Sequence, residues 1–283
     1  MANKDWTLGF IGAGVMAEVM IAGLIADGVV EPAQIRASNR RAERSIELNE
    51  RYGIACTLDN AEVAQSADML VLSVKPQTLP KVLEDLHDKL RPGTSVLSIV
   101  AGARIEALQR GLNHKDVSRC MPNLPCRIRK GMTVWYTVPE VREESVAAIV
   151  MVLSVMGETI RVHDESHVDR ATAVNGTGPA IVAQFVKALL EAATFIGEPR
   201  SLAHDTVLAT LAGTVEMIRR SDVHVAQLID EVTSPGGTTS RALQVLKKGR
   251  FSAVLTDSID AAHERTVALG EALDTKINTA PSR

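Results

Sequence analysis

The sequence is poor in the residues that build disulfide frameworks and metal sites. It has three cysteines, Cys56, Cys120 and Cys126, an odd number without paired metal-ligand spacing. Such usage is typical of reduced thiols in a reducing compartment. The seven histidines are scattered and form no HExxH-like cluster. We therefore expect no metal site.

The sequence also lacks a concentrated positive charge and a long apolar run. The formal net charge is −3 and the basic residues are spread along the chain, which argues against a nucleic-acid partner. No apolar run approaches the roughly 20 residues that span a bilayer. The N-terminal MANKDW leads into a strand-like segment without the apolar core of a signal peptide. We expect a cytoplasmic protein that binds neither membrane nor nucleic acid.

The chain of 283 residues is 46% hydrophobic, which is enough to form the cores of two domains. Residues 1–163 alternate short apolar segments with stretches long enough for crossover helices. The strand-like segments are WTLGFI, IRAS, DMLVLSV, TSVLSIV, VSRCM and MTVWYTV. This order predicts an α/β domain built on a parallel, doubly wound sheet.

Residues 164–283 read instead as helices, with long helical segments over 179–197 and 200–220. The first of these segments is apolar on more than one face. One face holds Ile181, Phe185, Ala188, Leu189, Ala192 and Phe195, and Val182, Val186, Leu190 and Ile196 make much of the remainder apolar. Either a compact bundle within one chain or a partner subunit covers this surface. We expect the partner subunit, because a segment of this length has little material for burying itself.

A glycine pattern follows the first strand and opens a helix. Gly12-Ala13-Gly14-Val15-Met16-Ala17 matches GxGxxG/A in the setting that a dinucleotide-binding turn requires. Gly12 permits the tight turn, Gly14 lets the backbone approach a pyrophosphate, and the helix N-terminus offers N–H groups. The alternative is a tight strand-to-helix turn without a ligand.

The end of the second strand distinguishes the two nicotinamide cofactors. It reads Ala37-Ser38-Asn39-Arg40-Arg41, with no acid at the strand tip to bind a ribose hydroxyl. Hydroxyl, amide and guanidinium groups suit a 2′-phosphate, which favours NADP(H) over NAD(H). If Arg40 and Arg41 are only solvated surface residues, either cofactor is possible.

Two more segments end parallel strands, where such sheets bind ligands. They are Leu72-Ser73-Val74-Lys75-Pro76 and Ser98-Ile99-Val100-Ala101-Gly102. Lys75 could be a cofactor contact, a general acid or a surface lysine. The predicted ligand is therefore a dinucleotide that crosses these strand ends.

Several motifs together resemble one family, the pyrroline-5-carboxylate reductases, over nearly the whole chain. They are FIGAGVMAEVMIAGL, LSVKPQ, the SIVAG strand end, RCMPNLP, DESHVDRATAVNGTGPA and VTSPGGTT. The resemblance implies an N-terminal Rossmann-type domain that binds NAD(P)H and an all-α C-terminal dimerisation domain. It further implies an active site between the domains, a homodimer that commonly assembles into larger rings, and reduction of 1-pyrroline-5-carboxylate to L-proline, the last step of proline biosynthesis.

The resemblance also implies site residues. The cofactor positions are Ile11, Gly12, Ala13, Gly14, Val15, Met16, Asn39, Arg41, Asn60, Ser73, Val74, Lys75, Pro76, Ile99, Val100 and Ala101. The substrate positions are Glu165, Gly236, Gly237, Thr238 and Thr239.

These substrate residues suit a cyclic imine that carries a carboxylate. The Gly-Gly turn before a helix supplies N–H donors for the carboxylate. Thr238 or Thr239 adds a hydroxyl toward the ring nitrogen, and we expect Thr239 to be the closer of the two to that nitrogen. Glu165 would favour the iminium form or orient the nitrogen through water, unless it is a helix N-cap or surface acid. No catalytic histidine is required, because a protonated imine is already electrophilic.

The chain departs from the family pattern at Leu124, Asn175, Ile181 and Glu231. Two alternatives stay open, and the departures at Asn175, Ile181 and Glu231 are the reason for the second of them. One is a related imine or β-hydroxyacid reductase, for which Lys187 on the long helix would serve as acid, although the intact SPGGTT argues against it. The other is a non-catalytic paralogue that binds dinucleotide.

Overall fold

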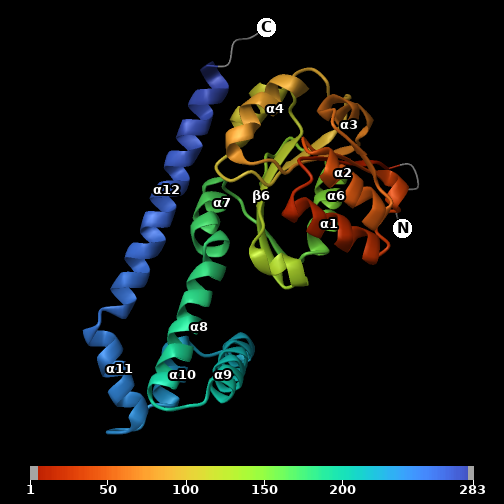
Figure 1. Ribbon diagram of the computed structural model, residues 1–283. Coiled ribbons are helices and arrows are strands. Elements are labelled where there is room, and N and C mark those ends of the chain that lie inside the picture. Colours follow the sequence, from red (N-terminus) through yellow and green to blue (C-terminus); the bar gives the residue numbers. More distant parts are fainter. Residues whose placement is uncertain (1–5, 280–283) are drawn as a thin grey trace. The chain divides into compact units, whose positions relative to one another are not determined.

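The computed structural model describes residues 6–279, which fold into two compact units (Figure 1). One unit runs to Thr177 and takes up the chain again from Ala262; the other is Gly178–Ala261. The predicted domain boundary at 163/164 stays a prediction. The outer ends of the two predicted domains, residues 1–5 and 280–283, lie outside the described residues.

A mixed sheet of eight described strands forms the first unit, in the order β3-β2-β1-β4-β5-β6-β7-β8. The strands are β1 (Leu8–Ile11), β2 (Ile35–Ser38), β3 (Ala55–Thr57), β4 (Met69–Leu72), β5 (Ser95–Ser98), β6 (Val117–Met121), β7 (Gly131–Thr137) and β8 (Gly157–Arg161). Neighbouring strands are parallel except for β6 and β7, which are antiparallel. The fold is therefore the predicted doubly wound type, with the last two strands, β7 and β8, running opposite to the other six.

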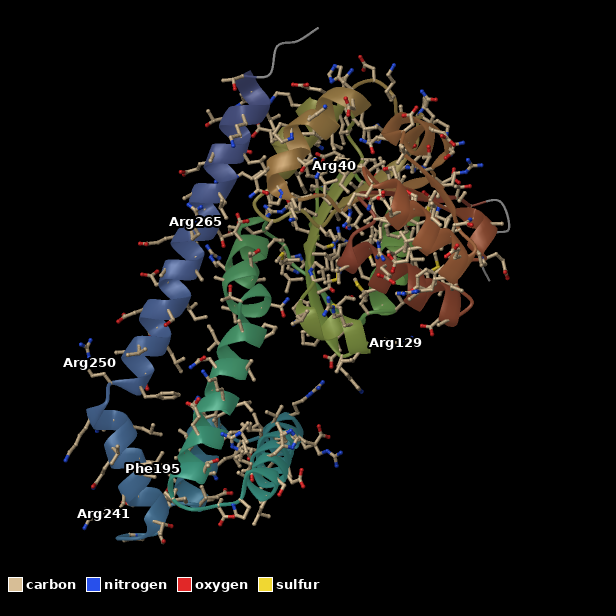
Figure 2. The ribbon with its side chains drawn as sticks, in the orientation of Figure 1. Arg40, Arg129, Phe195, Arg241, Arg250 and Arg265 are labelled. Carbon is tan, nitrogen blue, oxygen red and sulfur yellow. The ribbon has the colours of Figure 1, made fainter. Side chains whose placement is uncertain are left out.

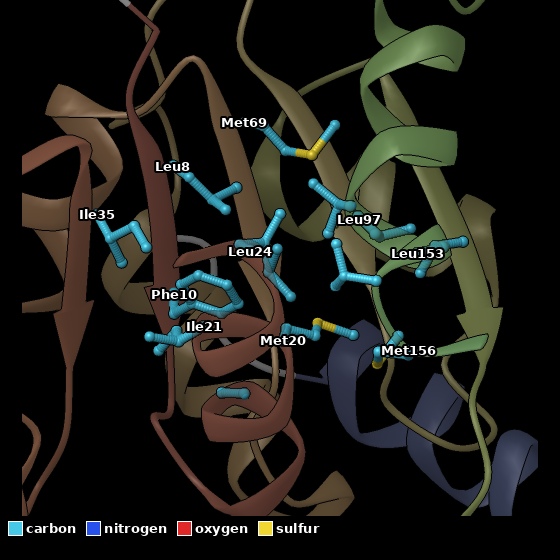
Figure 3. Close-up of a cluster of buried hydrophobic side chains, with 14 of the residues drawn as sticks. Leu8, Phe10, Met20, Ile21, Leu24, Ile35, Met69, Leu97, Leu153 and Met156 are labelled. Atoms are coloured by element: carbon cyan, nitrogen blue, oxygen red, sulfur yellow. The ribbon is translucent and has the colours of Figure 1, made fainter. Parts of the chain in front are cut away.

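Helices cover both faces of this sheet. They are α1 (Val15–Ala26), α2 (Ala42–Tyr52), α3 (Asn60–Ser66), α4 (Leu79–Leu86), α5 (Ile105–Leu112), α6 (Glu143–Ser154) and α7 (Ser166–Ala171). One buried cluster joins α1 and α6 to the strands, and Figure 3 shows Met20, Ile21 and Leu24 of α1 against Leu8 and Phe10 of β1. A second cluster joins α3, α4 and α5 to the sheet and includes Leu273. Because both faces are covered, β1, β4 and β5 are buried at every position, as parallel strands require.

The sequence located the central strands better than the edge. The segments IRAS and VSRCM coincide with β2 and β6. β8, with the sequence GETIR, was not predicted, because it is polar and its side chains are largely exposed. Its strand character comes from pairing with β7, a contact between segments rather than a local pattern.

The second unit is helical. It contains α8 (Gly178–Phe195), α9 (Arg200–Arg220), α10 (Val225–Glu231), α11 (Thr238–Lys248) and the start of α12 (Phe251–Thr279). Phe185 of α8 and Phe251 of α12 pack with ring centroids 6.1 Å apart. Yet no residue of α8 or α11 is buried within the chain, and Phe195, labelled in Figure 2, is 91% exposed. The compact bundle sealed within one chain is therefore wrong as a description of residues 178–261.

α12 is the longest described helix, and its residues from Ala262 onward belong to the first unit. Leu273 joins the second buried cluster there. None of the helices within residues 6–279 is both long and apolar enough to cross a bilayer.

Candidate active site

The turn between β1 and α1 has a backbone that only glycine adopts easily. Gly12 has a φ of +88°, and a Cβ at this position would lie 2.6 Å from Val74 Cγ1. The N–H groups of Gly12 and Ala13 donate to the Ser38 carbonyl at 3.1 and 3.0 Å. The turn is therefore tied to the end of β2, and glycine at position 12 is a structural requirement.

Gly14, in the same turn, has free space next to its Cα. A Cβ built on it would have no neighbour closer than Gly12 O at 4.0 Å. Gly14 is the N-cap residue of α1 and no side chain caps this helix, so the N–H groups of its first turn remain available. This space suits a phosphate at a helix N-terminus. Ile11 and Ala13 have fully buried side chains, so they can contact a ligand only through their backbone.

The end of β2 lies beside this turn. Asn39 Nδ2 donates to Ala13 O at 3.2 Å, and Asn39 Oδ1 accepts from the Arg41 N–H at 3.0 Å. The buried Ser38 donates from its hydroxyl to Asn60 Oδ1 at 2.7 Å. Asn39, Arg41 and Asn60 are thus brought together around one corner of the sheet.

The arginines near this corner differ in their partners. Arg44 is 11% exposed and pairs with Glu18 and with Glu47, and its Nε donates to Ala13 O at 3.3 Å. Arg40, labelled in Figure 2, and Arg41 are exposed and form no ion pair among residues 6–279. The charge of Arg44 is therefore already compensated, whereas Arg40 and Arg41 are available to an anion.

The two other predicted segments reach the same edge of the sheet. Ser73 N–H donates to Ile11 O at 2.9 Å, which places the end of β4 next to β1, and Ile99 N–H donates to Leu72 O at 3.0 Å, which places the end of β5 next to β4. The chain changes winding direction between β1 and β4, so this is the crevice where open parallel sheets bind ligands. Lys75 is exposed there, whereas the Val100 side chain is buried in the second cluster.

Glu165 is engaged by protein groups. Its Oε1 accepts from Arg119 Nη1 at 2.9 Å and from the Ile105 N–H at 2.9 Å. Arg119 also donates from Nη2 to Asp169 Oδ1 at 2.7 Å. Glu165 does not cap α7 with its side chain; Asp164 accepts from the Ser166 N–H and hydroxyl, hydrogen bonds that lower the pKa of Asp164. Glu165 therefore stands at the N-cap position of α7, as the alternative interpretation expected, but its side chain makes no capping hydrogen bond there.

The SPGGTT segment forms the predicted turn into a helix. Gly236 has a φ of +73°, and Gly237 is the N-cap residue of α11, with no side-chain cap. A Cβ on Gly237 would require the Ser234 hydroxyl to rotate away and would lie 3.2 Å from the Ser234 carbonyl oxygen, so the turn is tight at this position. Thr238 is exposed and Thr239 is partly buried at the first turn of α11. Glu231, the departure before this motif, is the last residue of α10 and is exposed.

Sequence reasoning missed Arg44, Arg119 and Asp169. Arg119 stands inside the buried strand VSRCM, and a charged side chain there requires carboxylate partners. Glu165 and Asp169 are four positions apart, a spacing that places both on one helix face. These two signals together could have identified the cluster.

Two family models match the chain. One, described as pyrroline-5-carboxylate reductase dimerisation, matches residues 165–269, and one described as NADP oxidoreductase, coenzyme F420-dependent, matches residues 7–102.

Similar proteins match along nearly their whole length. A pyrroline-5-carboxylate reductase of Synechocystis is 37% identical over 265 residues, which is 93% of this chain and 98% of that protein. One of Pseudomonas aeruginosa is 36% identical over 267 residues, 94% of this chain and 97% of that protein. The solved structure of the Plasmodium falciparum pyrroline carboxylate reductase with NADP bound has a TM-score of 0.85 at 28% identity, covering 94% of this chain and 99% of that one.

Proposed function

Because this chain belongs to the pyrroline-5-carboxylate reductase family, we propose that it binds NADPH along the ends of β1, β2, β4 and β5 and binds its substrate at the turn before α11. The enzyme reduces the cyclic imine 1-pyrroline-5-carboxylate to proline with a nicotinamide cofactor. The cofactor, when bound, supplies the hydride that the imine carbon accepts.

The observation that carries the cofactor proposal is the open space at Gly14 beside an uncapped helix start. Its neighbours extend the same surface, with Asn39, Arg41 and Asn60 on one side and Ser73–Pro76 and Ile99–Ala101 on the other. The exposed and unpaired Arg41 favours a 2′-phosphate, and so NADPH over NADH. NADH remains a usable but poorer donor in this proposal.

For the substrate, the first turn of α11 would hold the carboxylate. Its N–H groups have no side-chain cap, and the helix dipole favours an anion at this end. Thr239 is the hydroxyl that we place toward the ring nitrogen, with Thr238 beside it. These residues bind and orient an imine that is already electrophilic once protonated, so catalysis rests on position and exclusion of water.

The chain is a homo-oligomer, and we place its contacts on the helical unit. Val182, Phe195 and Ile196 are 59%, 91% and 79% exposed in the single chain. These exposed apolar side chains lie near both ends of α8. Apolar exposure of this kind is favoured when a partner covers it, and a second copy of the chain supplies the cover by symmetry. A homodimer through α8 to α12, with further assembly of dimers into a ring, is the proposed arrangement.

The other reductase chemistry has little support from this chain. Lys187, the lysine that a β-hydroxyacid reductase would need, is 65% exposed and lies 3.7 Å from Glu191 on the next turn. The curated relatives are pyrroline-5-carboxylate reductases along their whole length. An assay of NADPH oxidation with pyrroline-5-carboxylate tests the activity; cofactor binding without turnover would instead indicate a non-catalytic paralogue.

Gly14→Ala tests the cofactor site with little disturbance of the fold. The added methyl meets no protein atom closer than 4.0 Å, so the thermal stability should be unchanged. The methyl would occupy the space that we assign to the phosphate, and NADPH affinity should fall by on the order of 10-fold or more. Unchanged affinity for NADPH in a folded Gly14→Ala protein would refute the site. Gly28→Ala is not a suitable control because Gly28 has a φ of +61°, whereas Ala22→Ser on α1 is conservative and distant from the turn.

A further inference from the structure

A buried arginine on β6 connects two parts of the first unit. Arg119 is 1% exposed, and it pairs through Nη1 with Glu165 and through Nη2 with Asp169. Its Nε is buried and has no hydrogen-bond partner among the described residues. A guanidinium buried between two carboxylates adds little net stability, because the desolvation of the charges offsets much of their attraction. The cluster therefore calls for a reason other than stability.

Glu165 extends this cluster to the start of α5. The oxygen that meets Arg119, Oε1, also accepts the N–H of Ile105, the first residue of α5. α5 has no cap from its own N-cap residue, Arg104. A carboxylate from the N-terminus of α7, 60 positions along the chain, thus fixes the point where the loop after β5 enters α5.

That loop holds the predicted cofactor residues Ile99–Ala101 and is fixed at other points as well. Val100 N–H donates to Ser98 Oγ at 3.2 Å, and Ala103 N–H donates to Val100 O at 3.2 Å. At Gly102, a Cβ would lie 3.1 Å from the Gly270 backbone N of α12. Removal of the Glu165 contact therefore frees one end of a loop whose other end remains anchored.

We propose that Arg119 and Glu165 are positioning residues, which hold the loop from Ile99 to Arg104 in the shape that binds the nicotinamide cofactor. Glu165 acts on the cofactor through the Ile105 N–H and does not act on the substrate nitrogen. Arg119 fixes the carboxylate of Glu165, and Asp169 fixes the second amino group of Arg119. This inference rests on the proposed cofactor site.

Comparison of Glu165→Gln with Glu165→Ala distinguishes a positioning role of Glu165 from an electrostatic one. Glu165→Gln retains an oxygen that accepts the Ile105 N–H but removes the negative charge, whereas Glu165→Ala removes both. As a positioning residue, Glu165→Ala should raise the KM for NADPH by on the order of 10-fold and leave the KM for pyrroline-5-carboxylate within about twofold. Glu165→Gln should recover most of the NADPH affinity. An electrostatic role of Glu165 toward an iminium substrate predicts instead that both variants lose activity toward pyrroline-5-carboxylate to the same extent, because both remove the negative charge.

Amide hydrogen exchange supplies a readout besides activity. In Glu165→Ala, exchange should accelerate in the peptide that contains Ile105 and the preceding loop, and not in the sheet. In Arg119→Lys the side chain keeps its charge but pairs with one carboxylate at a time. Amide exchange in the same peptide should therefore accelerate less than in Glu165→Ala. The matched control is Glu84→Gln, an exposed acid on α4, which should leave exchange and both KM values unchanged.

A rise in the substrate KM, or a fall in kcat, with NADPH affinity and loop exchange unchanged would overturn the inference. Failure of the cofactor site itself is recognised separately, because Gly14→Ala would then bind NADPH as tightly as the wild type. A folded Glu165→Ala protein with wild-type kinetics and wild-type exchange would also refute the positioning role.

Discussion

Asn123 donates a hydrogen bond from Nδ2 to Asn175 Oδ1 at 2.7 Å, across 52 positions of sequence. Asn175 in turn donates from its own Nδ2 to Met121 O and to Met132 O at 3.2 and 2.9 Å. Asn175 lies in the π-helical turn Thr172–Gly176 that precedes α8. The residue that departs from the family pattern is therefore joined to β6 and β7 within its own unit.

Asn175→Ser, which restores the family residue, should destabilise this chain. A serine hydroxyl cannot reach all three partners, so the Met121 and Met132 carbonyls lose a donor. We expect a loss on the order of 1–3 kcal/mol in the free energy of unfolding, measured as a lower thermal midpoint. Asn278→Ser, at an exposed position on α12, is the control and should change little. Equal midpoints for the two variants would contradict the structural role of Asn175.

Substitutions of Arg41 and of Arg44 should have different effects on cofactor preference and on stability. Arg41→Ala removes an exposed, unpaired cation and should raise the KM for NADPH by about 10-fold or more, with a much smaller effect on the KM for NADH. Arg44→Ala removes the partner of Glu18 and should lower the thermal midpoint and affect both cofactors alike. Equal effects of Arg41→Ala on NADPH and NADH would refute its 2′-phosphate role. Lys81→Ala, an exposed lysine on α4, is the charge-matched control.

Glu18 should make the stability depend on acid pH. Burial alone would raise the pKa of its carboxyl, but hydrogen bonds from Arg44, Tyr52 and Arg51 outweigh burial and lower the pKa below 4.5. A carboxyl whose pKa is lower in the folded than in the unfolded state stabilises the fold above the unfolded pKa, and this contribution is lost as the pH falls through the folded value.

Glu18→Gln should therefore lower the thermal midpoint at about pH 7, and the difference from wild type should shrink toward about pH 3. Thermal unfolding of both proteins across this range measures the effect. Glu84→Gln, an exposed acid on α4, should show no such convergence. A Glu18→Gln difference that is constant with pH would exclude the ion-paired carboxylate as its source.

Gly270→Ala should disturb the loop after β5 from the side of α12. The added Cβ would lie 3.0 Å from Gly102 O, a tight contact that the loop must relieve by moving. Alanine is favoured over glycine in a helix by about 1 kcal/mol, so stability should change little while the KM for NADPH rises. Ala268→Gly, at an exposed position of the same helix, measures the helix-propensity effect alone. An unchanged KM for NADPH would show that this contact does not shape the cofactor loop.

Elements with local signals can be read directly from the amino-acid sequence. The glycine turn after β1, the buried parallel strands and the helical second half follow from glycine placement, apolar runs and their period. The SPGGTT turn before α11 was likewise visible, because glycine before a helix start is a feature of consecutive residues. The family itself was also recognisable at this level, since its motifs occur in order along the chain.

The pairing of charged groups, in contrast, depends on the folded chain. Arg41 and Arg44 look alike in sequence, yet Arg44 is compensated by Glu18 from another helix. Glu165 is a candidate substrate residue by sequence, and only the fold shows that its carboxylate accepts hydrogen bonds from Arg119 and from the start of α5. The edge strand β8 similarly exists because β7 pairs with it. Such pairings depend on where the sheet brings distant segments together, and no periodicity within either segment encodes them.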